Sequence, residues 1–331
     1  MIRLTKTFAA IATAVVLGLG LGVSTSAAAA QIDECIAPAD PGGGWDFTCR
    51  SVGKLLHELG LTDSPVRVVN MPGGVGAVAY ADVSSKRADD SSLIVATSTV
   101  GVAQIAQGRY PRGADAMRWL GMLGTDVGVV LVAKDSPYDS LKDMLNQLVA
   151  DPGSVVLAGS SGVGGWDQVR ILMLAEAAGL PSDKIARTRW VQFDGGGPAV
   201  VQLMGGSVDV VSTDLGEIAG FIKSGDVRVL AVLSDDPLPA PFEQLPTAKS
   251  QGYDVVGYNW RGFYTGGEVS DADYQAMVAT LKQVYDSAEW KAVAKKHGLT
   301  TIWRGGDEFE DFVHESIDKI EKISRDIGVI K

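Results

Sequence analysis

The residues that could do chemistry in this chain gather in short loops, and most of them are glycine, serine or aspartate. The stretch PADPGGGWDFTCR (38–50) carries three consecutive glycines, and glycine recurs at 73–76, 159–165 and 195–197. Glycine allows positive φ and a close approach of backbone to a ligand. Where such a loop opens a helix, free N–H groups and the helix dipole favour an anion. The glycine loops therefore predict an anion-binding site made of backbone, although each loop alone is also compatible with a simple tight turn.

Three other functions need to be considered: dinucleotide binding, serine-dependent hydrolysis and metal binding. GVGAVA (74–79) fits the dinucleotide fingerprint G-x-G-x-x-A, which is a weak signal when it stands alone. AGSSG (158–162) resembles a serine nucleophile elbow but lacks the glycine two residues before Ser160. The three histidines, His57, His297 and His314, are scattered, and no metal-ligand spacing is present. We therefore expect a binding protein, with no enzymatic activity, no cofactor and no metal, and keep an exported hydrolase as a minor alternative.

The N-terminal segment predicts export. Arg3 and Lys6 precede an apolar run from about Phe8 to Val23, and Ala28 and Ala30 suit an Ala-x-Ala cleavage site before Gln31. A membrane anchor is the alternative, but the run is shorter than the roughly 20 residues that a spanning helix needs. We expect a signal peptide over 1–30, cleavage near Ala30 and a periplasmic location.

The net charge, the two cysteines and the length each restrict what kind of protein this is. The formal net charge is −11, which argues against nucleic acid or an anionic membrane surface as a partner. Because export leads to an oxidising compartment, the two cysteines, Cys35 and Cys49, favour a disulfide over two free buried thiols. A length of 331 residues favours two domains.

The elements that must position the loops alternate between strand and helix. Strand-like runs are expected at 66–70, 92–99, 117–123, 128–134, 154–160, 187–193, 208–214 and 227–234. Helical runs stand between them, including one that Ser140 could cap and a C-terminal one over 307–330 with an apolar face formed by Phe309, Phe312, Val313, Ile317, Ile320 and Ile327. This alternation predicts an α/β fold with mostly parallel sheets and flanking helices.

Three stretches of the sequence resemble the signatures of a known protein family. Pro41, Gly42, Gly43, Asp46 and Arg50 match the first loop of the TctC-like (Bug) substrate-binding proteins of tripartite tricarboxylate transporters. VNMPGGVGAVAY (69–80) is similar to the second signature of that family, and FDGGGPAVVQLMGGSVDV (193–210) to a later one. Cys49 and Trp45 depart from the usual pattern, and together with CIAP (35–38) they resemble the citrate-type subgroup.

The resemblance implies a two-domain periplasmic binding protein fold with a ligand cleft between the domains. Domain 1 would comprise 31–130 and 260–331, and domain 2 would comprise 131–259, with crossings near Val130 and Asn259. It also implies carboxylate ligands held mainly by backbone amides and water. The ligand-binding residues expected from the loops and the resemblance are Pro41, Gly42, Gly43, Gly44, Trp45, Asp46, Gly73, Gly74, Thr97, Ser98, Thr99, Ser160, Ser161, Gly162, Gly164, Asp194, Gly195, Gly196 and Asp214.

The resemblance further implies a partner. A monomeric binding protein of this kind would pass a citrate-like di- or tricarboxylate to a membrane permease of two subunits. A binding protein that reports its ligand to a membrane sensor without transport remains the alternative. Within the first loop, Asp46 and Arg50 are four residues apart, so they are expected to pair and to fix the first turn of a helix.

Overall fold

The computed structural model describes residues 30–326, 328 and 330, which form ten strands and ten α-helices joined by short 3₁₀ turns. The strands are β1 (Glu34–Ala37), β2 (Arg67–Asn70), β3 (Leu93–Ser98), β4 (Met117–Ala133), β5 (Val156–Gly159), β6 (Arg189–Gln192), β7 (Val210–Asp214), β8 (Val227–Val232), β9 (Tyr258–Gly266) and β10 (Arg304–Gly305). The helices are α1 (Gly44–Glu58), α2 (Ala77–Lys86), α3 (Thr99–Ala106), α4 (Leu141–Ala150), α5 (Trp166–Ala177), α6 (Gly196–Met204), α7 (Leu215–Ser224), α8 (Asp271–Asp286), α9 (Ala288–His297) and α10 (Asp307–Asp326).

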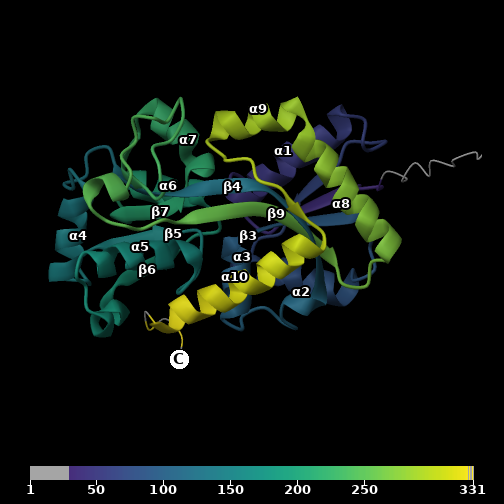
Figure 1. Ribbon diagram of the computed structural model, residues 1–331. Coiled ribbons are helices and arrows are strands. Elements are labelled where there is room, and N and C mark those ends of the chain that lie inside the picture. The colour runs from purple at the N-terminus through teal and green to yellow at the C-terminus, as the bar shows by residue number, and fades with distance from the viewer. Residues whose placement is uncertain (1–29, 327, 329, 331) are drawn as a thin grey trace, which may run out of the picture.

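The strands form one sheet in the order β2-β1-β3-β9-β4-β7-β5-β6, and β8 and β10 also pair with β4 (Figure 1). The outer pairs, β1 with β2 and β3 and β5 with β6 and β7, are parallel as the sequence predicts. The middle differs from that expectation, because β4 and β9 run antiparallel to each other and to their outer neighbours. The cause is topological, since one strand carries the chain to the far half of the sheet and the other carries it back.

Strand β4 is a single strand of 17 residues where the sequence suggests two. It pairs with β9 over Met117–Val127 and with β7 and β8 over Gly128–Ala133. Glycine at 124 lets the segment at Thr300 lie against this strand, because a Cβ on Gly124 would lie 2.6 Å from the Thr300 carbonyl oxygen. The predicted crossing points, Val130 and Asn259, lie on β4 and β9, while the division into two domains stays a prediction.

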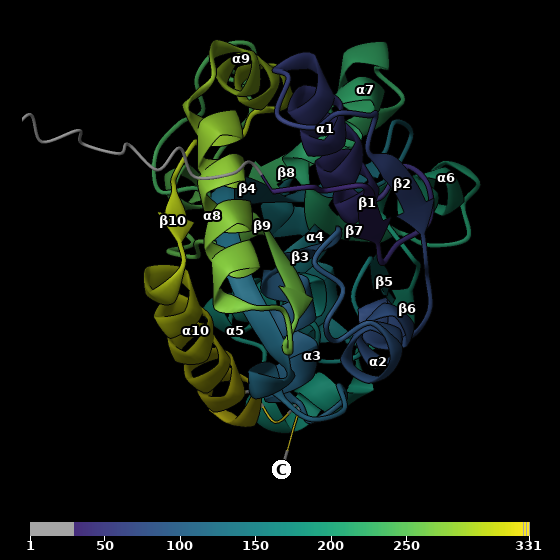
Figure 2. The ribbon, with the colours of Figure 1, turned by 90° about the vertical axis from the view of Figure 1, so that its right-hand side faces the viewer.

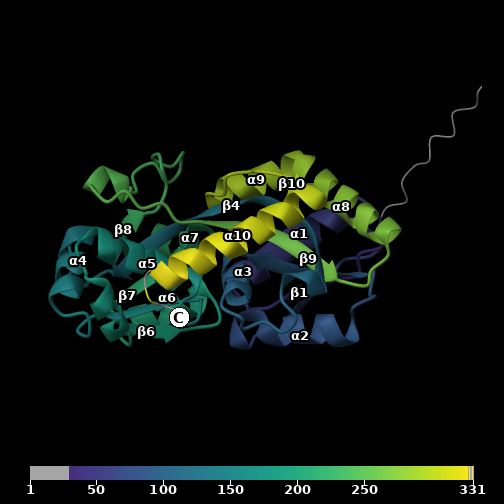
Figure 3. The same ribbon diagram turned by 60° about the horizontal axis from the view of Figure 1, so that its bottom comes forward.

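Helices cover both faces of the sheet. Helix α1 packs on β1 and β3 and lies beside α8, as Figure 2 shows. Helix α4 begins at Ser140, whose hydroxyl accepts a hydrogen bond from the Asp143 amide, so the predicted N-cap is confirmed. Helix α10 crosses the molecule diagonally over α3 (Figure 3) and buries Phe309, Val313 and Ile320, while the expected Ile327 lies outside the described residues.

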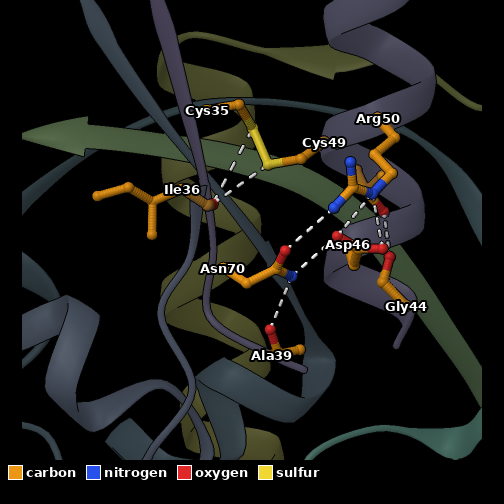
Figure 4. The surroundings of a disulfide bond; sticks show 9 residues. Cys35, Ile36, Ala39, Gly44, Asp46, Cys49, Arg50 and Asn70 are labelled. Carbon is orange, nitrogen blue, oxygen red and sulfur yellow. Dashed lines mark hydrogen bonds and ion pairs between the residues drawn. A yellow bond between two sulfur atoms is a disulfide. The ribbon is translucent and has the colours of Figure 1, made fainter. Parts of the chain in front are cut away.

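The disulfide between Cys35 and Cys49 is confirmed, with Cα atoms 5.7 Å apart, and the free-thiol alternative is wrong. It joins β1 to α1 on either side of the first glycine loop (Figure 4). The predicted pair is present beside it, because Arg50 Nε lies 2.9 Å from the Asp46 carboxylate. Asp46 also accepts hydrogen bonds from the Asn70 side chain and the Gly42 amide. These contacts fix the entrance of α1 relative to β1 and β2.

Candidate ligand-binding cavity

A small cavity opens where loops from both ends of the sheet meet. About 330 Å³ of empty space lies between its walls, part of it open to solvent. The interior has room for only about one or two water molecules. The cavity is lined by Pro38, Ala39, Gly44, Trp45, Val75, Ser98, Val100, Ser160, Asp194, Gly195, Glu217, Asn259 and Arg261.

The loops on either side of this cavity touch one another. The Asp40 amide donates to the Asp194 carbonyl at 3.0 Å, and a Cβ on Gly195 would lie 2.9 Å from the Gly43 Cα. A second set of contacts joins the loop after α3 to the loop after β5, where Gln107 and Arg109 donate side-chain hydrogen bonds to the carbonyls of Gly164 and Val163. The structure therefore presents the cavity in a closed form.

Unpartnered donors converge on the cavity. Among the described residues nothing accepts a hydrogen bond from the amides of Gly44 and Trp45, in the first turn of α1. The Ser98 hydroxyl oxygen accepts from Trp45 Nε1 at 3.1 Å and from the Val100 amide at 3.2 Å, so its own O–H can donate elsewhere. Helix N-termini that present free N–H groups favour anions.

Arg261 is the cation of this cavity. Its side chain is 2% exposed, and Nη2 contacts the carboxylates of Asp126 at 2.8 Å and Asp214 at 2.9 Å. Within the described part of the chain, Nε and Nη1 donate no hydrogen bond, and a Cβ on Gly44 would lie 2.2 Å from Nη1. Arg261 therefore brings a positive charge and an unused N–H edge beside the first turn of α1.

Arg261 belongs to a buried cluster of ion pairs that also contains Arg170. Arg170 bridges Asp167 and Asp214, and Asp214 also accepts from the Asn259 side chain. Burial would raise the pKa of Asp214, but Arg170 and Arg261 outweigh it and the pKa is lowered. Burial raises the pKa of Asp126 to about 6, with the charge of Asp214 adding to burial and Arg261 opposing it. Asp214 is thus the firmly ionised centre of the cluster.

Glu217 faces the cavity from the first turn of α7. Its carboxylate accepts a hydrogen bond from the Gly196 amide at 2.6 Å and lies 3.3 Å from Arg261 Nη2. Burial raises the pKa of Glu217 to about 8, because the charges of Asp214 and Asp167 add to the loss of solvation and Arg261 only partly offsets them. Glu217 therefore holds its proton to a higher pH than an exposed glutamate does.

Some of the predicted ligand-binding residues line the cavity, and the others lie outside its lining. Those that line it are Gly44, Trp45, Ser98, Ser160, Asp194 and Gly195. Pro41, Gly42, Gly43, Gly73, Gly74 and Gly196 belong to the loops that form its walls without lining it.

The remaining predicted residues lie outside the lining of the cavity, and several of them make structural contacts. Asp46 binds Arg50, and Thr99 Oγ1 accepts from the Trp260 amide at 3.3 Å. Ser161 accepts from the Asp167 amide at 3.0 Å, and Asp214 lies in the ionic cluster. Thr97, Gly162 and Gly164 likewise lie outside the lining.

Sequence reasoning missed Glu217, Asn259 and Arg261, together with the apolar lining residues Pro38, Ala39, Val75 and Val100. A signal for two of them was present. Asn259 and Arg261 stand two residues apart in a strand that is otherwise aromatic and apolar, and the period of two places both on one face. A polar pair on one face of a buried strand indicates a site or an ion-pair network.

Comparison with known proteins shows the family of this chain. Residues 55–329 match the model of the tripartite tricarboxylate transporter family receptor (TctC), so the chain belongs to that family of solute-binding proteins. It is 27% identical over 305 residues to protein BugT of Bordetella pertussis, with 89% of each chain covered.

Two solved structures share the fold. One is MatC from Rhodopseudomonas palustris with bound malate, at a TM-score of 0.75 and 19% identity, covering 88% of this chain and 98% of that one. The other is R. palustris Rpa4515 with adipate, at a TM-score of 0.76 and 18% identity, covering 90% and 97%. Within the described residues, no helix has the length and hydropathy to cross a bilayer.

Proposed function

We propose that this protein captures a small di- or tricarboxylate in the cavity between its two halves and delivers it to a two-subunit membrane permease. The proposal rests on two sets of hydrogen-bond donors that lie side by side. They are the backbone amides of Gly44 and Trp45 and the Nε and Nη1 groups of Arg261, none of which donates a hydrogen bond within the described residues. A carboxylate can accept from two amides and a guanidinium at once. The malate and adipate of the two structural neighbours support this ligand class, and citrate is the largest candidate.

The proposal includes the arrangement around the ligand. The halves are residues 31–130 with 260–331, and residues 131–259, and they would part about β4 and β9 to admit the ligand. We further propose that the mature protein begins near Gln31, acts as a monomer in the periplasm and carries out no chemistry on its ligand.

A ligand panel tests the binding class. Thermal unfolding would be followed with succinate, malate, adipate and citrate, and with arginine and spermidine as cationic controls. Ligand at 100 times its Kd stabilises the native state by about 2.7 kcal/mol. We expect a rise in Tm with at least one of the four carboxylates. Stabilisation by the cations alone would contradict the proposal.

Transport and sensing need a separate experiment, because both begin with the same binding step. Deleting the gene should abolish uptake of the radiolabelled carboxylate, and expression of the wild-type chain should restore it. Uptake that persists unchanged in the deletion strain would favour the sensing alternative.

A further inference from the structure

The Glu217 carboxyl group occupies a position suited to a ligand carboxylate. Its Oε2 accepts from the Gly196 amide in the first turn of α6, and a Cβ on Gly44 in the first turn of α1 would lie 2.4 Å from its Oε1. The side chain is 3% exposed but lines the cavity. A ligand carboxylate that binds Arg261 and the α1 amides therefore comes to rest beside a second carboxyl group.

The charges around Glu217 do not balance if every acid is ionised. Two guanidinium groups, Arg170 and Arg261, meet four carboxyl groups. Those carboxyl groups belong to Asp126, Asp167, Asp214 and Glu217. An anionic ligand adds further negative charge, and two like charges at contact distance in a buried site cannot both persist without a proton between them.

Among the described residues, the other titratable groups on elements packed against α7 supply no further positive charge at the Glu217 carboxyl. On β8, Arg228 donates hydrogen bonds to the carbonyls of Lys134 and Ser136. On the α9 side His297 hydrogen-bonds with the Gly216 backbone, and burial lowers its pKa. Lys296 lies with His297 in a separate hollow on the outer side of α7. From α1, Asp46 is paired with Arg50.

The cavity wall adds another acid. Burial raises the pKa of Asp194, with the charge of Asp40 adding to it. Helix α6 carries no titratable side chain. The field at Glu217 is therefore set by Arg261 and by an excess of acids.

We propose that Glu217 acts as a carboxylic acid that donates a hydrogen bond to the ligand carboxylate, so that binding requires a proton on this side chain. The inference rests on the proposed function and assigns Glu217 as a specificity-determining residue of that site. The pKa of about 8 agrees with it, because the side chain is then protonated at neutral pH and ready to donate. In the ionised form, it would repel the ligand.

The consequence is a pH dependence with a definite sign. Malate and adipate are fully ionised above pH 7, so their own titration does not contribute. If the protonated protein binds, affinity is constant below about pH 8 and falls by about tenfold for each pH unit well above it. The protein should also take up a proton when the ligand binds at pH 9, because most Glu217 side chains are ionised before binding and become protonated in the complex.

Isothermal titration calorimetry on the full mature chain with malate and adipate tests this inference at pH 7.0, 8.0, 9.0 and 9.5. Runs at pH 9.0 in two buffers of different ionisation enthalpy count the protons. For the wild type we expect about one proton per ligand and roughly a 30-fold loss of affinity between pH 7.0 and 9.5. Glu217→Gln keeps a donor without titrating, so it should lose the pH slope and the proton uptake together.

Glu176→Gln is the matched control, since Glu176 is an exposed residue near the end of α5. It should show the slope and proton uptake of the wild type. Wild-type affinity that stays flat to pH 9.5 without proton uptake would overturn the inference and leave the proposed function intact. Folded Glu217→Gln that binds neither ligand at pH 7.0, or that keeps the wild-type slope, would also overturn it. If neither malate, adipate, succinate nor citrate binds the wild type, the proposed function itself fails.

Discussion

At the scale of single residues, the site requires glycine at position 44, because a larger residue would not fit there. Gly44 is not among the glycines with positive φ, so glycine is not needed here for backbone freedom. What matters is space, because a Cβ would lie 2.2 Å from Arg261 Nη1 and 2.4 Å from Glu217 Oε1. Both partners are buried and tied to other groups, so neither can move without breaking an ion pair or hydrogen bond.

We therefore predict that Gly44→Ala weakens carboxylate binding at least about tenfold, because overpacking of about 1–3 kcal/mol falls on the groups that hold the ligand. Calorimetric titration with malate or adipate measures the change. Gly220→Ala is the control, since Gly220 lies in α7 with open space around its Cβ position. The control should bind as the wild type does and gain slightly in stability. Equal affinities for the wild type and Gly44→Ala would show that the ligand binds elsewhere.

Asp46 illustrates a residue whose role is structural. Burial alone would raise its pKa, but hydrogen bonds from Arg50, Gly42 and Asn70 outweigh burial and lower it. A carboxyl group whose pKa is lower in the folded protein stabilises the fold above its unfolded value. That contribution is lost as the pH falls through the folded pKa.

We predict that Asp46→Asn lowers the free energy of unfolding by about 1–2 kcal/mol at pH 7, through weaker hydrogen bonds to Arg50 and Gly42. The difference from the wild type should shrink as the pH falls below about 4, where both side chains are neutral. Urea unfolding at pH 7, 5 and 3.5 measures it. A difference that stays constant over this range would show that the charge of Asp46 plays no part.

At the scale of elements, the disulfide ties β1 to α1 across the first glycine loop. The two cysteines are 14 residues apart, and both are fully buried. Because the bond restricts a short loop of the unfolded chain, it should stabilise the native state by about 3 kcal/mol in the chain-entropy model. It also holds the α1 amides in place relative to the strand.

We predict that the double variant Cys35→Ala/Cys49→Ala unfolds at a lower urea concentration than the oxidised wild type. Because reductant should reproduce most of the loss in the wild type but leave the variant unchanged, the variant is the control for reduction. A wild type whose midpoint is insensitive to strong reductant under denaturing conditions would contradict a stabilising role of the bond.

The sequence predicted the elements well because their signals are local. Strand and helix positions follow from runs of apolar residues and from caps such as Ser140. It missed the continuity of β4 and the antiparallel centre of the sheet, since both depend on pairing with β9, which lies more than 120 residues later in the chain. For the site, two of the glycine loops contribute Gly44 and Gly195 to the lining of the cavity. Arg261 and Glu217 were missed because their chemistry arises from burial beside groups distant in sequence.

At the scale of the whole molecule, the closed cavity implies motion. A di- or tricarboxylate does not fit between walls that leave room for only about one or two water molecules. Under the proposed function the two halves separate to admit the ligand, and the contacts from Gln107 and Arg109 to the loop after β5 then break. Neither residue lines the cavity.

We predict that Gln107→Ala/Arg109→Ala shifts the ligand-free protein toward the open form. Small-angle scattering should give a larger radius of gyration than for the wild type, and saturating carboxylate should reduce the difference. Binding should weaken, because part of the binding free energy is then used to close the molecule. Identical scattering curves and affinities for the two proteins would show that this contact does not influence closure. Lys142→Ala, at an exposed position, is the control for surface substitution.

The pairing of β3 with β9 sets the order in which this protein can fold. β3 ends at Ser98, and the strand that covers its edge begins at Tyr258, so the N-terminal strands wait for most of the chain to be synthesised. Contacts between residues so far apart slow folding, because a long loop must close first. A nascent chain that ends before β9 would expose a buried strand edge and would be prone to aggregate. Stable folding of the N-terminal strands therefore depends on a part of the chain that is synthesised about 160 residues later.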